Sequence, residues 1–153
     1  MITSNEDRYA SHLPVLEAVV AEHDVRSVLE VGCGHHSTPF FLDLPNLKRL
    51  VSIETNAEWA DAIREDHPAY DRLEMVVVDN SAKALEDYLL TDFDLVFIDN
   101  GDNAAERLEV IHHVLGRTHP TVVIHDAEVP EYRDVIEGFP HVIVGVPWTA
   151  VIR

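Results

Sequence analysis

Five short apolar segments, rich in valine and isoleucine, most limit how this chain can fold. Each is nearly continuous rather than alternating, which is typical of strands that are buried on both faces. Segments with helical patterns separate them, and regular alternation of strands and helices predicts a parallel sheet with helices on both faces. The predicted strands are Ser27–Val31, Leu50–Ile53, Leu73–Val78, Asp94–Ile98 and Thr121–Ile124.

The expected helices are placed by their periodicity and their capping residues. Asn56, Ser81 and Asn103 are candidate N-caps, because their side-chain oxygens can accept hydrogen bonds from the free N–H groups of a first turn. A leading helix is expected to start, or to be interrupted, near Pro14. The expected helices are Glu6–His23, Ser37–Leu42, Ala57–Asp66, Ala82–Leu90, Ala104–Leu115 and Pro130–Glu137.

The end of the chain departs from this alternation. Two predicted strands, His141–Val146 and Thr149–Ile152, are joined only by Pro147 and Trp148. So short a connection permits only an antiparallel pair. The expected α/β fold is therefore a single doubly wound sheet of five parallel strands plus a C-terminal antiparallel hairpin.

Composition narrows the possible partners. The 153 residues carry a net charge of −17, with 28 acidic residues and only two lysines, Lys48 and Lys83. Such a charge repels phosphate backbones, so we expect no nucleic-acid partner. No apolar run approaches the roughly 20 residues that span a membrane, so we expect no membrane partner. The polar N-terminus and the single cysteine, Cys33, favour a cytoplasmic location, and the charge balance also fits a halophilic source.

The first predicted strand leads into a glycine-rich turn, Glu30-Val31-Gly32-Cys33-Gly34. Gly32 allows a sharp turn, and Gly34 allows a ligand to approach the backbone closely. The Glu30 carboxylate could organise this loop and the amino-acid end of a cofactor. The alternative is a glycine turn that only packs the strand against the following helix.

Acidic residues also follow the second and third predicted strands. Glu54, with Thr55 beside it, lies 20 residues after Gly34, where a carboxylate can accept hydrogen bonds from both ribose hydroxyls of an adenosine cofactor. The alternative is an ordinary surface glutamate. Polar residues that could reach an adenine ring follow the third strand: Asp79, Asn80 and Ser81.

The catalytic side is expected where the fourth and fifth strands end, in Phe97-Ile98-Asp99 and Ile124-His125-Asp126. The carboxyl ends of neighbouring parallel strands meet at one edge of the sheet. His125 is a candidate general base, because its free pKa lies near neutrality, or else a residue with only local hydrogen bonds. Asp99 and Asp126 could orient an acceptor.

These motifs resemble those of the class I (Rossmann-like) S-adenosylmethionine-dependent methyltransferases, nearest the small-molecule branch with F-I-D and H-D strand ends. The resemblance covers about residues 25–128. It implies strand order 3-2-1-4-5-7-6, a helical cap over residues 1–24 and one domain over residues 25–153. It also implies catalysis by Asp99, His125 and Asp126. The implied cofactor residues are Glu30, Gly32, Cys33, Gly34, Glu54, Thr55, Asp79, Asn80, Ser81 and Asp99.

The resemblance is incomplete at the catalytic side. Catechol-type methyltransferases hold a metal between these strand ends, with an Asn after the second Asp as third ligand, and here that position is Ala127. We therefore expect no metal. A histidine often present after the fourth strand is also missing from the segment Asp102-Asn103-Ala104-Ala105.

The leading hypothesis is methyl transfer from adenosylmethionine to an O or N atom of a small molecule. One alternative is a non-catalytic or partner-dependent adenosylmethionine-binding module, and the short predicted lid is also compatible with a site completed in a homo-oligomer. A second alternative, an NAD-linked oxidoreductase, is disfavoured by Ser37 in the glycine fingerprint and by the terminal hairpin. Trp59 is interpreted as a packing residue and Arg107 as a helix-surface residue.

The charge of −17 predicts that salt stabilises the fold. Like charges repel in the compact state, and the Debye length falls from about 30 Å at 0.01 M salt to about 3 Å at 1 M. We expect the melting temperature to rise from dilute buffer to 1 M sodium chloride, and equally in potassium chloride. A melting temperature that falls steadily with added salt would contradict this prediction.

Overall fold

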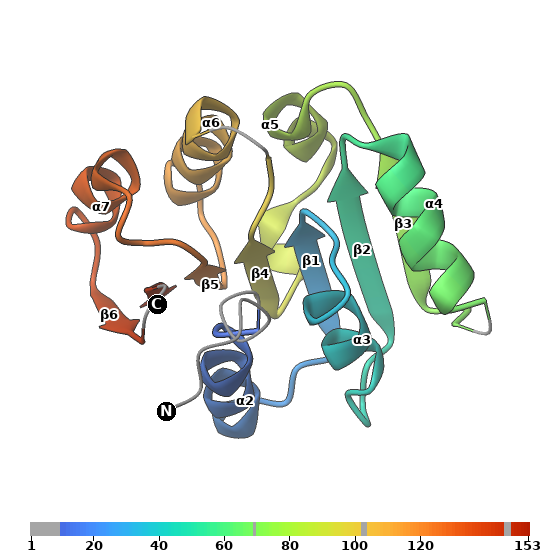
Figure 1. The fold of residues 1–153 in the computed structure, drawn as a ribbon. Helices are drawn as coiled ribbons and strands as arrows, with labels where there is room; N and C mark the ends of the chain where they lie inside the picture. Colours follow the sequence, from blue (N-terminus) through green and yellow to red (C-terminus); the bar gives the residue numbers. More distant parts are fainter. Residues whose placement is uncertain (1–9, 69, 102–103, 146–147) are drawn as a thin grey trace, which may run out of the picture.

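Seven strands form one sheet in the order β3-β2-β1-β4-β5-β7-β6, as predicted (Figure 1). The computed structural model describes residues 10–68, 70–101, 104–145 and 148–153. The first five strands are parallel, whereas β7 pairs antiparallel with both β5 and β6. The strands are β1 (Ser27–Val31), β2 (Arg49–Glu54), β3 (Leu73–Val77), β4 (Leu95–Ile98), β5 (Thr121–Ile124), β6 (His141–Val144) and β7 (Thr149–Ile152).

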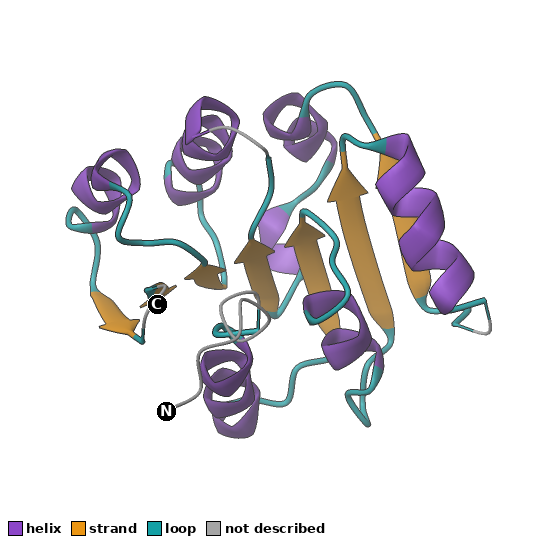
Figure 2. Cartoon of the chain, viewed as in Figure 1, coloured by secondary structure: helices purple, strands orange, loops and turns teal. Residues whose placement is uncertain are grey.

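Helices cover both faces of this sheet (Figure 2). One apolar cluster joins the sheet to α2 and α3, and a second joins its other face to α5, α6 and α7. Val28 belongs to the first cluster and its neighbour Leu29 to the second, because successive strand residues point to opposite faces. The helices are α2 (Leu13–Glu22), α3 (Ser37–Leu42), α4 (Ala57–Asp66), α5 (Ser81–Ala84), α6 (Ala104–Leu115) and α7 (Pro130–Ile136).

The predicted helix Ala82–Leu90 is wrong in extent. Helix α5 ends at Ala84, and two 3₁₀ turns, Leu85–Asp87 and Leu90–Asp92, lead into β4. The distant Arg117 explains the early end, because its guanidinium donates hydrogen bonds of 3.0 Å to the carbonyl of Leu85 and 2.7 Å to that of Tyr88. This side chain satisfies carbonyl groups near the end of the short helix, so the backbone there can leave the α conformation.

Two of the three predicted N-caps can be compared with the structure. The Asn56 side chain accepts a hydrogen bond of 3.0 Å from the Trp59 N–H, which confirms this cap. Ser81 is not the cap of α5, because Asn80 takes that role and accepts from the Lys83 N–H at 2.9 Å. The predicted cap Asn103 lies outside the described residues.

The two ends of the chain follow the prediction in part. Helix α2 begins at Leu13 with a proline in its first turn, and the predicted residues before position 10 lie outside the described ranges. The hairpin strand β6 forms one edge of the sheet and leaves Val142 52% and Val144 47% exposed.

Across the ranges that the structure describes, no helix has the length and apolar character needed to cross a membrane.

A close backbone contact fixes where β1 ends. Gly32 has a φ of +90°, and a Cβ atom at this position would lie 2.5 Å from the Asp99 carbonyl oxygen and 2.6 Å from the Asn100 Cα. Both the torsion angle and the contact therefore require glycine. Its N–H donates to the Ile53 carbonyl at 2.8 Å, so the turn lies between the ends of β2 and β4.

Gly32→Ala should destabilise the fold by about 1–3 kcal/mol or more, because alanine meets backbone atoms and is strained at positive φ. Gly34→Ala is the matched control, since a Cβ there would be in ordinary contact, 3.6 Å from the Ser37 Oγ. Urea unfolding of both variants measures the difference. Equal stability of the two variants would show that the contact at Gly32 relaxes without cost.

Candidate functional site

A cavity of about 350 Å³ opens at the carboxyl ends of β1 and β4. The glycine turn and Asp99 both form part of its lining. Three of the predicted cofactor residues, Cys33, Gly34 and Asp99, therefore share one wall. The lining residues are His12, Cys33, Gly34, His35, His36, Ser37, Trp59 and Asp99.

The carboxylate of Glu30 lies beneath the glycine turn and is fully buried. Ser37 donates a hydrogen bond of 2.5 Å to one of its oxygens, and Thr38 (2.9 Å) and Ser52 donate to the other. Burial raises the pKa of Glu30 to about 7, although the three hydroxyl donors act in the opposite direction. This side chain connects β1 to α3 and β2 and does not line the cavity. Thr38 links it to the turn, because its Oγ1 accepts a hydrogen bond of 3.0 Å from the Gly34 N–H.

Glu54 joins the end of β2 to the same turn. Its carboxylate accepts hydrogen bonds from the backbone N–H groups of Thr55 (2.9 Å), Asn56 (3.0 Å) and Cys33 (3.2 Å). Burial, together with the nearby Glu54 charge, raises the pKa of the Cys33 thiol. The thiol therefore stays protonated at neutral pH and is a packing group rather than a nucleophile.

The space around Gly34 indicates whether a ligand can approach the backbone of the turn. A side chain at this position would meet no protein atom closer than 3.6 Å, so the fold itself does not require glycine there. Gly34 is also one of the residues that line the cavity. A glycine that faces a cavity and is not required by packing fits close approach of a cofactor to the backbone.

Trp59 also belongs to the cavity wall, in addition to making the packing contacts that the sequence predicted. Its side chain is 38% exposed, and its indole N–H donates a hydrogen bond of 2.8 Å to the Cys33 carbonyl. The His35 ring stands edge-on to it, with ring centroids 4.7 Å apart. The sequence offered one indication that Trp59 lies near the site, because this residue falls in the first turn of the helix that follows Glu54.

The polar residues after β3 lie at the same edge of the sheet but outside the cavity. Asp79 is exposed, Asn80 caps α5, and Ser81 is buried. The structure thus places the predicted cofactor residues along the ends of β1, β2 and β3, and only those of the glycine turn and Asp99 line the cavity.

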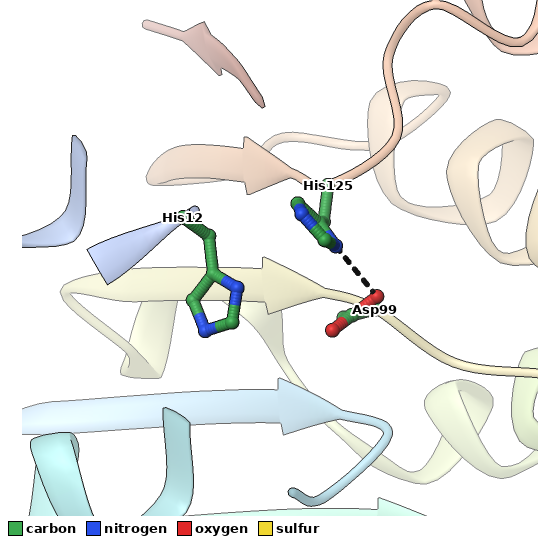
Figure 3. Close-up of side chains that lie close together, drawn as sticks. All are labelled: His12, Asp99 and His125. Carbon is green, nitrogen blue, oxygen red and sulfur yellow. Dashed lines mark hydrogen bonds and ion pairs between the residues drawn. The ribbon is translucent and has the colours of Figure 1, made fainter. Parts of the chain in front are cut away.

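The structure brings the three predicted catalytic residues together. The Nδ1 atom of His125 lies 3.1 Å from the Asp99 carboxylate (Figure 3). It lies 3.6 Å from the carboxylate of Asp126. Its Nε2 atom lies 3.1 Å from the Ser11 hydroxyl. Burial alone would lower the pKa of His125, but the hydrogen bond to Asp99 and the charges of Asp99 and Asp126 outweigh it and raise the pKa.

Arg107 holds the two aspartates and is not the surface residue that we expected. It is only 7% exposed, and its guanidinium contacts Asp99 at 3.2 Å and Asp126 at 2.8 Å. Its Nε–H donates to the Asn100 carbonyl at 2.7 Å. Asp126 has a φ of +57°, a conformation that aspartate tolerates better than most residues.

His12 is a site residue that the sequence analysis missed. It lies in the turn before α2 and is 2% exposed, with its ring centroid 4.9 Å from that of His125 and 5.2 Å from that of Phe97. Burial lowers its pKa to about 4, so the imidazole is neutral at physiological pH. No local motif marks this histidine, because the two rings that it contacts belong to residues 85 and 113 positions away in sequence.

Comparison with known proteins places the fold. No family model and no curated protein matches the sequence. A Staphylococcus aureus protein, provisionally assigned as a caffeoyl-CoA O-methyltransferase, is 13% identical with a TM-score of 0.70, covering 99% of this chain and 84% of its own. The N-methyltransferase NodS from Bradyrhizobium japonicum, in complex with S-adenosylhomocysteine, is 14% identical with a TM-score of 0.64, covering 93% and 83%.

A third similar structure is spermidine synthase from Thermotoga maritima, which is 14% identical with a TM-score of 0.68. That match covers 98% of this chain and 61% of the synthase. At such low identity these similarities establish the architecture alone. The chain has the class I methyltransferase fold, as the resemblance of its motifs implied.

The pKa of Glu30 predicts a specific pH dependence of stability. Because the folded-state pKa of about 7 lies above the ordinary value of 4.5, the folded protein binds this proton more tightly than the unfolded chain. The stabilisation is therefore complete below pH 4.5 and is lost as the pH rises through 7. At about 1.4 kcal/mol per pKa unit, roughly 2–3 kcal/mol should be lost between pH 5 and pH 8.

Glu30→Gln should remove this component, so the stability difference between wild type and variant should change by that amount over the same interval. Glu58→Gln, at an exposed position in the first turn of α4, is the control. Chemical unfolding at each pH supplies the free energies. A difference between wild type and Glu30→Gln that is independent of pH would contradict the prediction.

Proposed function

We propose that this protein binds S-adenosylmethionine and transfers its methyl group to an O or N atom of a small molecule. The observation that carries the proposal is the cavity in which the glycine turn and Asp99 share one wall. In a doubly wound sheet, ligands bind outside the carboxyl ends of the strands, next to the point where strand order reverses. Here that point lies between β1 and β4.

The residues present fit the cofactor. Gly34 offers backbone without a side chain, and Glu54 offers a partly exposed carboxylate that three backbone N–H groups hold in place. Glu54 would accept from the ribose hydroxyls, and the polar group Asp79–Ser81 lies farther along the same edge for the adenine. Trp59 would cover one side of the cofactor. Glu30 would act through the turn rather than by contact.

Methyl transfer requires alignment more than activation. Adenosylmethionine, when bound, supplies a methyl group that its sulfonium already activates. The chain has to orient the acceptor and remove a proton. Asp99 lies in the cavity wall and would accept a hydrogen bond from the acceptor. His125 contacts Asp99 and would act as the base where no metal is bound, while Asp126 shares Arg107 with Asp99.

Two alternatives have different consequences. A non-catalytic module would bind adenosylmethionine without turnover, and incubation of radiolabelled cofactor with candidate hydroxyl and amine acceptors separates it from an enzyme. An NAD-linked oxidoreductase is disfavoured by Ser37, which is buried with its hydroxyl on Glu30 at the position where the dinucleotide fingerprint has its third glycine. The antiparallel β7 also differs from a dinucleotide-binding sheet.

Calorimetric titration with adenosylmethionine and S-adenosylhomocysteine tests the cofactor site. Glu54→Ala should weaken binding by about 1–3 kcal/mol, the usual cost of lost hydrogen bonds to a charged group. Gly34→Ala should also weaken binding while leaving the fold intact, because its methyl group enters the cavity. Glu58→Ala is the surface control. Unchanged affinity in both site variants, or preferential binding of NAD, would refute the assignment.

A further inference from the structure

Three side chains that are far apart in sequence meet beside the cavity: His12, Asp99 and His125 (Figure 3). One candidate ligand atom of each lies within 4.8 Å of the other two. His12 and Asp99 also line the cavity. We propose that these three side chains bind a divalent transition-metal cation of the Zn²⁺ type, with a coordination position open toward the cavity.

His12 provides the evidence that is independent of the cluster itself. It is almost fully buried, and neither of its ring nitrogens has a hydrogen-bond partner among the described residues. Buried polar atoms nearly always have a partner, and an isolated one calls for an explanation such as a bound ion. Figure 3 shows the His12 ring close to Asp99 and His125, with a dashed line only between the other two. A cation there would be the missing partner.

His125 is held in an orientation that suits a ligand. Its two nitrogens face different groups, Nε2 the Ser11 hydroxyl and Nδ1 the Asp99 carboxylate, each at 3.1 Å. When Nε2 carries the proton and donates it to Ser11, Nδ1 presents its lone pair toward Asp99. Metal-binding histidines usually donate their other N–H to a neighbouring oxygen in this way. Ser11 is therefore a positioning residue in the proposal.

The donor set selects the kind of cation. Two imidazole nitrogens and one carboxylate oxygen are typical of catalytic zinc and non-haem iron(II) sites, which keep coordination positions open. Mg²⁺ and Ca²⁺ prefer oxygen ligands. In a tetrahedral site, bonds of about 2.0–2.2 Å place the ligand atoms about 3.4 Å apart, so cation binding requires the most distant pair to close by roughly 1.4 Å.

This site differs from the metal arrangement that the sequence resemblance implies. There, the donors come from the two strand-end aspartates and the next residue. Here Ala127 has no donor, and Asp126 is paired with Arg107 at 2.8 Å. The expectation of no metal rested on Ala127 alone, because sequence could not place His12 next to Asp99.

The charges and the cavity are compatible with a cation. Asp99 and Asp126 contribute two negative charges and Arg107 one positive charge, so a dication leaves a local charge of about +1 within a chain of −17. A bound cation lowers the pKa of a coordinated hydroxyl, which favours an acceptor with an ionisable hydroxyl group. That inference about the acceptor rests on the proposed methyltransferase function, whereas cation binding does not.

Titration of the tag-free full chain with ZnCl₂, followed by calorimetry, tests the site, and Co²⁺ provides visible absorption bands that report nitrogen ligation. We expect one site per chain that millimolar Mg²⁺ does not displace. His12→Phe, which keeps a ring beside Phe97, and Asp99→Asn should each weaken Zn²⁺ binding at least tenfold. His112→Ala, at an exposed position of α6, should bind like the wild type.

Absence of stoichiometric Zn²⁺ binding, or equal binding by wild type and both site variants, would overturn the proposal. Circular dichroism confirms that each variant is folded, and Asp99→Asn decides the matter if His12→Phe does not fold. Titration of the wild type with adenosylmethionine, with and without Zn²⁺, keeps the two proposals separable. Cofactor binding without Zn²⁺ binding would reject the metal site and leave the proposed function standing.

Discussion

The turn after β1 lies directly against the backbone at the end of β4, and the rest of the site depends on this contact. Gly32 makes it possible by having no side chain, and the Asp99 N–H donates to the Val31 carbonyl at 2.9 Å on the same edge. The contact places the glycine turn beside Asp99, so a cofactor and an acceptor can share one cavity. Glu30, one residue before Val31, accepts hydrogen bonds from three hydroxyl groups, and that of Thr38 also accepts from the Gly34 N–H of the turn.

Sequence predicted those parts of the molecule that local patterns determine. Continuous apolar runs identified the parallel strands, and the short link before Thr149 identified the antiparallel hairpin. The helix after Ser81 was predicted too long, because Arg117, more than 30 residues away, binds the carbonyls at its end. The positions of Arg107 and His12 beside the site were missed for the same reason. Their roles arise from contacts across the sheet edge, and no periodicity or motif encodes such contacts.

Several of the few basic residues in this acidic chain are arginines that bind backbone carbonyls between elements of the fold. Arg107 binds two carboxylates and a carbonyl at the ends of β4 and β5, and Arg117 binds two carbonyls near α5. Arg72 does the same with the carbonyls of Leu42 and Leu47. A planar guanidinium can donate to several acceptors at once, which an ammonium group on a flexible stem does less well. Because arginine makes all of these contacts, they do not depend on the two lysines of the chain.

Because β6 is an exposed edge strand, salt should affect the association of this protein as well as its stability. An edge strand with apolar residues facing water offers free backbone groups and an adhesive surface to another molecule, and Val142 and Val144 supply that surface here. In dilute buffer, the charge of −17 keeps copies of the chain apart. Screening removes this repulsion between molecules as well as within each one. Colloidal solubility and conformational stability thus respond to ionic strength in opposite directions, and the useful salt concentration for handling the protein lies between the two limits.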